Sequence, residues 1–164
     1  MSDDESAPAK MHSGYHGWMK SIPKTGQERD KSEWARERLR QHILDSFAFM
    51  DDALSLSIKA TSVVRCDGDA KIVFSRGKKR CGYDMSVKFE YESTRLGEDD
   101  EGFPEATGHV ELHDFDDTSG EEYEISVKAE GNSQHAKDAR AAVQKWEAGL
   151  RKLLAAWKEE LLQQ

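Results

Sequence analysis

A β-hairpin with a basic turn is predicted by the segment Gly68-Asp69-Ala70-Lys71-Ile72-Val73-Phe74-Ser75-Arg76-Gly77-Lys78-Lys79-Arg80-Cys81-Gly82-Tyr83-Asp84. Apolar residues alternate with polar ones on both sides of its centre, as in two half-buried strands. They are Ala70, Ile72 and Phe74 before the centre, and Tyr83, Met85, Val87, Phe89 and Tyr91 after it. Ser75-Arg76-Gly77-Lys78 forms the turn, because Gly77 takes a positive φ without a steric penalty.

The predicted turn concentrates positive charge. Arg76, Lys78, Lys79 and Arg80 lie at one end of the hairpin, although the whole chain carries a net charge of -8. Lys78-Lys79-Arg80 alone could be a solvated turn or part of a nuclear import signal. Four cations on a projecting turn instead favour encounter with an acidic patch on a partner, where they can donate hydrogen bonds to carboxylates or carbonyls.

Composition limits the classes of protein that fit this chain. Its 164 residues, 37% of them hydrophobic and 34% charged, suit one domain with a thin core. No apolar run is long enough to span a bilayer, and the acidic N-terminus is unlike a signal peptide, so we expect a cytoplasmic protein without membrane contact. A sequence pI near 5.3 argues against nucleic-acid binding. We expect Cys66 and Cys81 to be free thiols.

The N-terminal part of the chain differs from the rest. Residues 1–12 are acidic and nearly free of apolar side chains, so we predict a disordered tail. The next segment, Tyr15-His16-Gly17-Trp18-Met19, is expected to be a flexible arm. It carries large side chains that can contact other surfaces, among them Tyr15, His16 and Trp18. This arm could cap the core or bind a partner, and both interpretations stay open. Residues 13–164 are predicted to form a single domain.

Two predicted helices enclose the strands. The first begins near Asp30 or Ser32, where Asp30 and Glu33 have the spacing of a capping box. The second runs from about His135 to Leu162 with a continuous apolar stripe, long enough to lie along the whole sheet.

Alternation predicts further strands at 54–60, 106–115 and 123–129. Because short links join the strands, they should form an antiparallel meander. The expected fold class is therefore α+β: a meandering antiparallel sheet of four to five strands flanked by an N-terminal helix and a long C-terminal helix.

One pattern resembles a metal site. His109, Glu111 and His113 share one face of a predicted strand, which is an arrangement that ligands of a divalent metal can adopt. A solvated strand face explains the same residues, and a fourth ligand is not evident. No nucleophile elbow or phosphate-binding loop is present either. We predict no catalytic residue, no metal and no cofactor.

The hairpin resembles that of a known family. Gly68-Asp69, Ser75-Arg76-Gly77-Lys78 and Tyr83-Asp84 are similar, without gaps, to the hairpin in the N-terminal domain of the activator of heat-shock protein 90 ATPase family, whose turn usually reads R-K-G-K. Glu28-Arg29-Asp30-Lys31-Ser32-Glu33-Trp34 resembles the start of that family's first helix. The resemblance covers residues 14–160, without the family's second domain, and indicates a single-domain member.

The resemblance implies a function without catalysis. It implies a cochaperone, expected to be a monomer, that binds the middle domain of heat-shock protein 90 and stimulates its ATPase. By position, Arg76, Gly77 and Lys78 fall in the loop that acts on the chaperone, and Asp69 falls at an acidic position before it. Ser75 replaces the usual arginine, while Lys79 and Arg80 restore charge on the other side.

Two further expectations bear on partner and ligand. The chain lacks the family's N-x-N-N-W-H-W motif as written, and whether Tyr15-His16-Gly17-Trp18 replaces it stays open; this segment completes the predicted partner-binding set. A long C-terminal helix on an antiparallel sheet could also form a helix-grip carrier of a hydrophobic ligand. A sizeable apolar cavity between helix and sheet would favour that carrier, and a filled core would favour the cochaperone.

Overall fold

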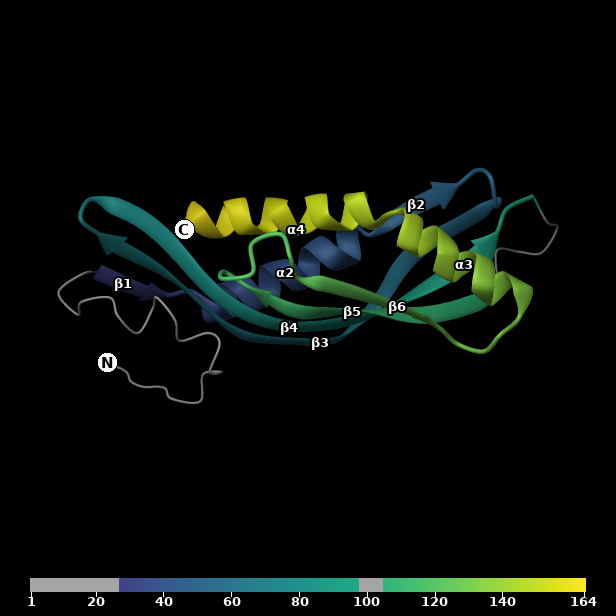
Figure 1. The fold of residues 1–164 in the computed structure, drawn as a ribbon, viewed down its shortest axis with the longest axis horizontal. Coiled ribbons are helices and arrows are strands. Elements are labelled where there is room, and N and C mark those ends of the chain that lie inside the picture. The colour runs from purple at the N-terminus through teal and green to yellow at the C-terminus, as the bar shows by residue number, and fades with distance from the viewer. Residues whose placement is uncertain (1–26, 98–104) are drawn as a thin grey trace.

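The computed structural model describes residues 27–97 and 105–164, so the predicted tail 1–12 and the residues Tyr15, His16 and Trp18 lie outside it. The described elements, in chain order, are β1 (Gln27–Asp30), α2 (Ser32–Ser46), β2 (Ala48–Asp51), β3 (Leu56–Ser75), β4 (Lys78–Arg95), β5 (Ala106–Asp116), β6 (Glu124–Ala129), α3 (Gln134–Lys145) and α4 (Glu147–Leu162). They form an elongated α+β structure in which a curved sheet carries the helices (Figure 1). The predicted fold class is confirmed.

The sheet has six strands among the described residues, with the order β1-β3-β4-β5-β6. Strand β2 also pairs with β3, and every pairing is antiparallel. The predicted meander is confirmed for β3 to β6. The expectation of four to five strands omitted the short edge strands β1 and β2, each of four residues.

Strand β3 is one 20-residue strand, whereas the alternation predicted separate strands before and after a polar stretch. Gly68 lets β3 continue through this polar stretch. Its φ of 136° would be strained for any other residue, and a Cβ at this position would collide with the Asp84 carbonyl. Register shifts at Ala60/Ser62 and Val63/Arg65 absorb the mismatch between β3 and β4. The result is a hairpin almost as long as the molecule (Figure 1).

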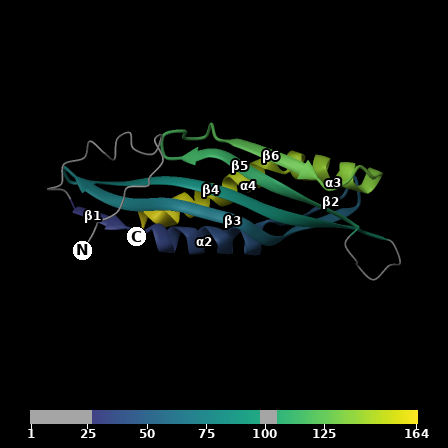
Figure 2. The ribbon, with the colours of Figure 1, turned by 90° about the horizontal axis from the view of Figure 1, so that it is seen from below.

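Helix α2 lies along the edge of β3 between β1 and β2 (Figure 2). Arg36 and Arg40 donate to the β3 carbonyls of Gly68 and Val63, which satisfies backbone groups on this edge. The predicted capping box is wrong in detail, because Lys31 occupies the cap position and makes no side-chain cap bond. The Asp30 carboxylate instead accepts hydrogen bonds from the backbone amide and the hydroxyl of Ser32.

The core between α4 and the sheet is filled by aromatic rings. Trp157 is fully buried and packs with its ring centre 5.1 Å from that of Tyr83 and 5.6 Å from that of Phe115. Its indole Nε1 donates to the Ala35 carbonyl at 3.0 Å, which ties α4 to α2. Glu160 adds an ion pair between the same helices, and the hydrogen bond from Arg38 lowers the pKa of that carboxyl to about 2. This filled contact disfavours the ligand carrier.

The C-terminal helix is broken, although its apolar stripe predicts one helix. Helix α3 ends at Lys145 and α4 begins at Glu147, with Trp146 between them. The Trp146 ring stacks on Phe49 with centres 4.7 Å apart and meets Phe47 edge-on. Gly149 makes room for this ring, since a Cβ there would overlap it. Tertiary packing of one aromatic side chain therefore interrupts the helix.

The histidine strand has protein partners on its polar face. Glu111 binds Arg65, and this ion pair lowers the Glu111 pKa. His113 Nε2 lies 2.9 Å from the Ser126 hydroxyl, and His109 faces Glu130. Within the ranges that the structure describes, no group of three His, Cys, Asp or Glu side chains could hold a metal ion.

Candidate functional site

The tip of the β3-β4 hairpin is a two-residue turn. Ser75 pairs with Lys78, and the residues between them, Arg76 and Gly77, have φ of 54° and 76°. Positive φ at both central positions matches the right-handed twist of the flanking strands. The predicted turn is therefore confirmed. Gly77 adopts its angle freely, whereas an arginine in the left-handed region is strained by about 1–2 kcal/mol.

The left-handed conformation of Arg76 should lower the stability of the wild-type chain. Arg76→Asn is expected to raise the free energy of unfolding by about 0.5–1 kcal/mol, because asparagine tolerates the left-handed conformation better than arginine does. Urea unfolding followed by circular dichroism measures this change. Lys78→Asn is the matched control, since it removes the same charge at a residue without positive φ. Equal stability changes in the two variants would show that the conformation of Arg76 carries no strain.

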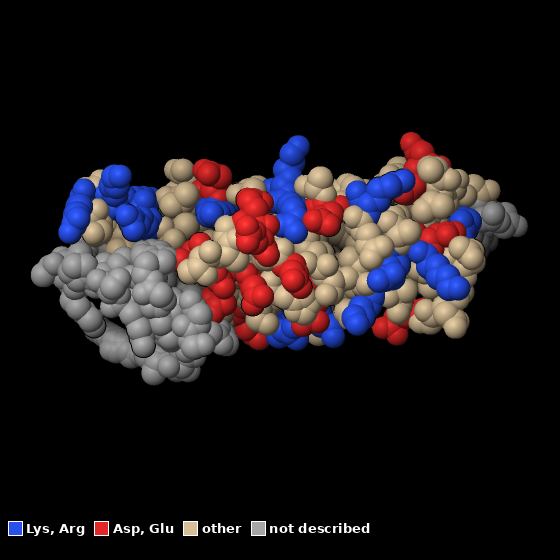
Figure 3. Space-filling view, viewed as in Figure 1, with Lys and Arg blue, Asp and Glu red and all other residues tan. Residues whose placement is uncertain are grey.

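The four predicted cations are all exposed at this tip. Arg76 lies in the turn, and Lys78, Lys79 and Arg80 open β4. Figure 3 shows Lys and Arg side chains gathered at the same end of the molecule. Because side chains alternate along a strand, Lys79 points to the opposite face from Lys78 and Arg80. The structure thus brings together the charges that the sequence predicted, with cations on both faces of the hairpin.

The other predicted site residues lie differently. Ser75 is half-buried at the end of β3 and pairs with Lys78. Asp69 is also half-buried, and it pairs with Asp84 on β4. Because Asp69 precedes Ser75 by six residues along β3, it lies about 20 Å from the turn. Asp69 is therefore not part of the basic turn.

Sequence reasoning missed two contacts at the hairpin tip, those of Arg29 and of Lys79 with the Phe74 ring. Strand β1 brings Arg29 beside β3, where its guanidinium carbon lies 5.2 Å from the centre of the Phe74 ring. Lys79 Nζ lies 5.8 Å from the same ring centre. The alternation identified Phe74 as an inward-facing residue, but no local signal linked it to Arg29, which is 45 residues away in the chain.

The cysteines are poorly suited to nucleophilic chemistry. Cys66 and Cys81 are free, as predicted. Burial raises the pKa of the Cys66 thiol to about 11 and also raises the pKa of Cys81. Both thiols are therefore protonated at neutral pH, whereas a nucleophilic cysteine needs the thiolate.

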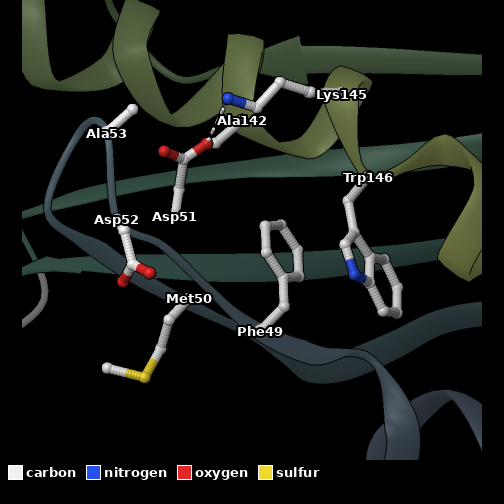
Figure 4. Close-up of a pocket in the computed structure, with 8 residues that line it drawn as sticks. All are labelled: Phe49, Met50, Asp51, Asp52, Ala53, Ala142, Lys145 and Trp146. Atoms are coloured by element: carbon white, nitrogen blue, oxygen red, sulfur yellow. Dashed lines mark ion pairs between the residues drawn. The ribbon is translucent and has the colours of Figure 1, made fainter.

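A shallow hollow lies away from the basic turn, beside the break between α3 and α4. It has a volume of about 200 Å³ and is lined by Phe49, Met50, Asp51, Asp52, Ala53, Ala142, Lys145 and Trp146. The Asp51 carboxylate is buried against Lys145 Nζ at 3.2 Å (Figure 4). This hollow is not the apolar cavity between helix and sheet that a ligand carrier requires.

These features define a class of protein. The described residues form an α+β binding domain with a filled core and an exposed cationic hairpin, which suits contact with an acidic surface of another protein. Among the helices that the structure describes, none combines the length and the apolar character needed to cross a membrane.

Comparisons with known proteins give the family. Residues 28–164 match the family described as Activator of Hsp90 ATPase, N-terminal. The crystal structure of Aha-1 from Plasmodium falciparum resembles the chain at 23% identity and a TM-score of 0.71, covering 83% of this chain and 88% of that chain. The solution structure of the human Aha1 N-terminal domain resembles it at 28% identity and a TM-score of 0.56, covering 84% and 100%. No curated protein sequence matches the chain.

The chain belongs to the Activator of Hsp90 ATPase, N-terminal family, because the match covers more than half of its length. The predicted family is confirmed. Membership also confirms the predicted function of an Hsp90 cochaperone, which binds the chaperone's middle domain, stimulates its ATPase and does not itself catalyse a reaction.

Proposed function

We propose that the basic turn of the β3-β4 hairpin is the element through which this chain activates Hsp90. The observation that carries the proposal is the exposure of Arg76, Lys78, Lys79 and Arg80 at the tip of a long hairpin, whose strands pair without a register shift over 65–75 and 78–88. A paired hairpin fixes the backbone from which these cations project, so less backbone entropy is lost on binding.

Activation would follow from unequal binding to two states of the chaperone. Arginine and lysine side chains can donate hydrogen bonds to carboxylates and backbone carbonyls of the partner. A cochaperone shifts a conformational equilibrium only if it binds the hydrolysis-competent arrangement more tightly than the resting one. In this mechanism the catalytic groups belong to Hsp90, and the turn stabilises their productive arrangement. At position 75, Ser75 would offer the partner a hydroxyl group in place of the arginine that the family usually has there.

The proposal also covers the domain boundaries, the cellular location and the remaining predicted contact residues. Residues 13–164 would act as one domain, preceded by the acidic tail 1–12, and the protein would work in the cytoplasm. The family match from residue 28 onward supports the main part of that domain. Tyr15, His16 and Trp18 would make a further contact with the chaperone, and Asp69 would make another about 20 Å from the turn along β3.

The ATPase rate of Hsp90 tests the proposal as the full chain is titrated in, with a specific Hsp90 inhibitor used to subtract background. We expect a saturable rise in rate whose half-saturating concentration increases about fivefold or more between low and high salt, because charge attraction is screened over about 8 Å at physiological ionic strength. A half-saturating concentration that does not respond to salt would indicate an apolar interface and contradict the role of the turn.

A further inference from the structure

The hairpin carries cations on the face toward α4 as well as at its tip. Phe74 and Lys79 are paired across β3 and β4, so their side chains project to one face. Arg29 pairs with Ile72, which is two residues from Phe74 and therefore on the same face. Lys78 and Arg80 project to the other face.

Arg29 is held in place from two sides. Its guanidinium lies over the Phe74 ring, and its Nη1 donates to the Gln164 carbonyl at 3.1 Å, just beyond the end of α4. The carbonyls at the end of a helix carry partial negative charge, which favours a cation there. One hydrogen bond leaves most of the five guanidinium donors available. Figures 1 and 2 place the end of α4 at the same end of the molecule as the hairpin tip.

Two like charges thus lie over one aromatic ring. Lys79 and Arg29 are both exposed, and in the described part of the chain neither forms an ion pair with a side-chain carboxylate, although Arg29 binds the main-chain oxygen of Gln164. The nearby carboxylate of Glu28 belongs to Lys71, at 3.5 Å. Phe74 belongs to β3, which lies between the strand of Arg29 and the strand of Lys79, and an external carboxylate beside either cation would be attracted by its charge.

We propose that Arg29, Phe74 and Lys79 form an inner cationic face that binds a carboxylate-bearing segment of Hsp90, so that Lys79 acts in this face and the activating contact of the turn is left to Arg76, Lys78 and Arg80. This inference rests on the proposed function of the turn. Phe74 is the positioning residue, because its ring holds both cations on one face and reduces the entropy lost when they bind.

A protein carboxylate suits this face better than a nucleic acid. Binding to a phosphate backbone relies on many neutralised phosphates, whereas the inner face offers two cations on a chain with a net charge of -8. Arginine also recognises a carboxylate through two parallel hydrogen bonds, which fits a single acidic side chain.

The test compares variants of the full chain in the Hsp90 ATPase titration and in a direct binding assay. Arg29→Gln with Lys79→Gln removes both charges and is expected to raise the half-saturating concentration about tenfold, with an unchanged maximal rate and a weaker salt dependence. Phe74→Leu keeps both charges and is expected to raise it about twofold to threefold, with the salt dependence preserved. Lys137→Gln with Lys152→Gln, at exposed positions on α3 and α4, is the matched control for the loss of two charges.

Each outcome bears on one hypothesis. If the wild-type chain activates Hsp90 but the double variant has the same half-saturating concentration and salt dependence, the inner face is not a contact. A lower maximal rate at an unchanged half-saturating concentration would also overturn the inference, since it would place these residues in the trigger. If the wild-type chain fails to activate Hsp90, the proposed function fails instead. Should the double variant unfold, Lys79→Gln alone applies the same criteria, because Lys79 makes no contact with α4 comparable to that of Arg29.

Discussion

Arg76→Glu combined with Lys78→Glu is expected to abolish stimulation of the Hsp90 ATPase, so that the rate stays at the basal value at every concentration of the variant. Both side chains are exposed at the hairpin tip, and reversal replaces two donors with two carboxylates. If the turn meets acidic or carbonyl groups, juxtaposed like charges oppose binding by several kcal/mol, which corresponds to about a hundredfold or more in affinity.

A second charge reversal supplies the control for this experiment. Lys128→Glu with Lys137→Glu changes the net charge by the same amount at exposed positions of β6 and α3, far from the turn. We expect this control to stimulate the ATPase nearly as well as the wild-type chain. Urea unfolding should give similar midpoints for all three proteins, since exposed charges contribute little to stability. Full stimulation by the turn variant would remove the turn from the mechanism.

Trp157→Ala is expected to lower the free energy of unfolding by about 3–5 kcal/mol. The Trp157 ring is fully buried between α4 and the sheet, and its truncation leaves a cavity beside Tyr83 and Phe115. The variant also leaves the Ala35 carbonyl without its indole donor. For a domain of this size, whose whole stability is about 5–15 kcal/mol, such a loss is a large fraction.

Urea denaturation monitored by circular dichroism measures this effect. Trp157→Phe is the matched variant, because it keeps a ring in the core and removes the indole N–H together with part of the volume. We expect it to lose about 1–3 kcal/mol, less than the alanine variant. A loss below about 1 kcal/mol for Trp157→Ala would mean that the ring does not organise the contact between α4 and the sheet.

The strongly periodic segments were predictable from the sequence. Alternation placed Tyr83, Met85, Val87, Phe89 and Tyr91 on the buried face of one strand, and all of them are buried in the structure. The basic turn was equally accessible, because its signal lies within a few consecutive residues. Local patterns of this kind need no knowledge of distant contacts.

The missed elements depend on contacts that are distant in sequence. Strands β1 and β2 have only four residues each, too few to establish a period, and β1 is entirely polar or charged. Both form because β3 offers backbone partners along its free edge. The helix break at Trp146 likewise depends on Phe49, almost a hundred residues earlier, while the apolar steps of the helix continue across the break.

The site was predicted in part for the same reason. Arg76, Lys78, Lys79 and Arg80 are neighbours in sequence and remain neighbours in space. Arg29 reaches Phe74 only through the pairing of β1 with β3, and charged residues near a helix start are ordinarily interpreted as caps. Asp30 is an example: the sequence pattern indicates a helix cap there, whereas Asp30 is the last residue of strand β1 and accepts hydrogen bonds from Ser32.

The unbroken register between β3 and β4 from Arg65 to Ser75 also constrains how this hairpin can change in evolution. Side chains alternate between faces with a period of two, so a slip of one residue would exchange the two faces of a whole strand. Lys79 would then leave the side of Phe74, and the apolar row of β4 would turn outward. Insertions and deletions in this part of either strand should therefore be tolerated in pairs of residues, whereas a single extra residue requires a bulge such as those near Ser62 and Val63.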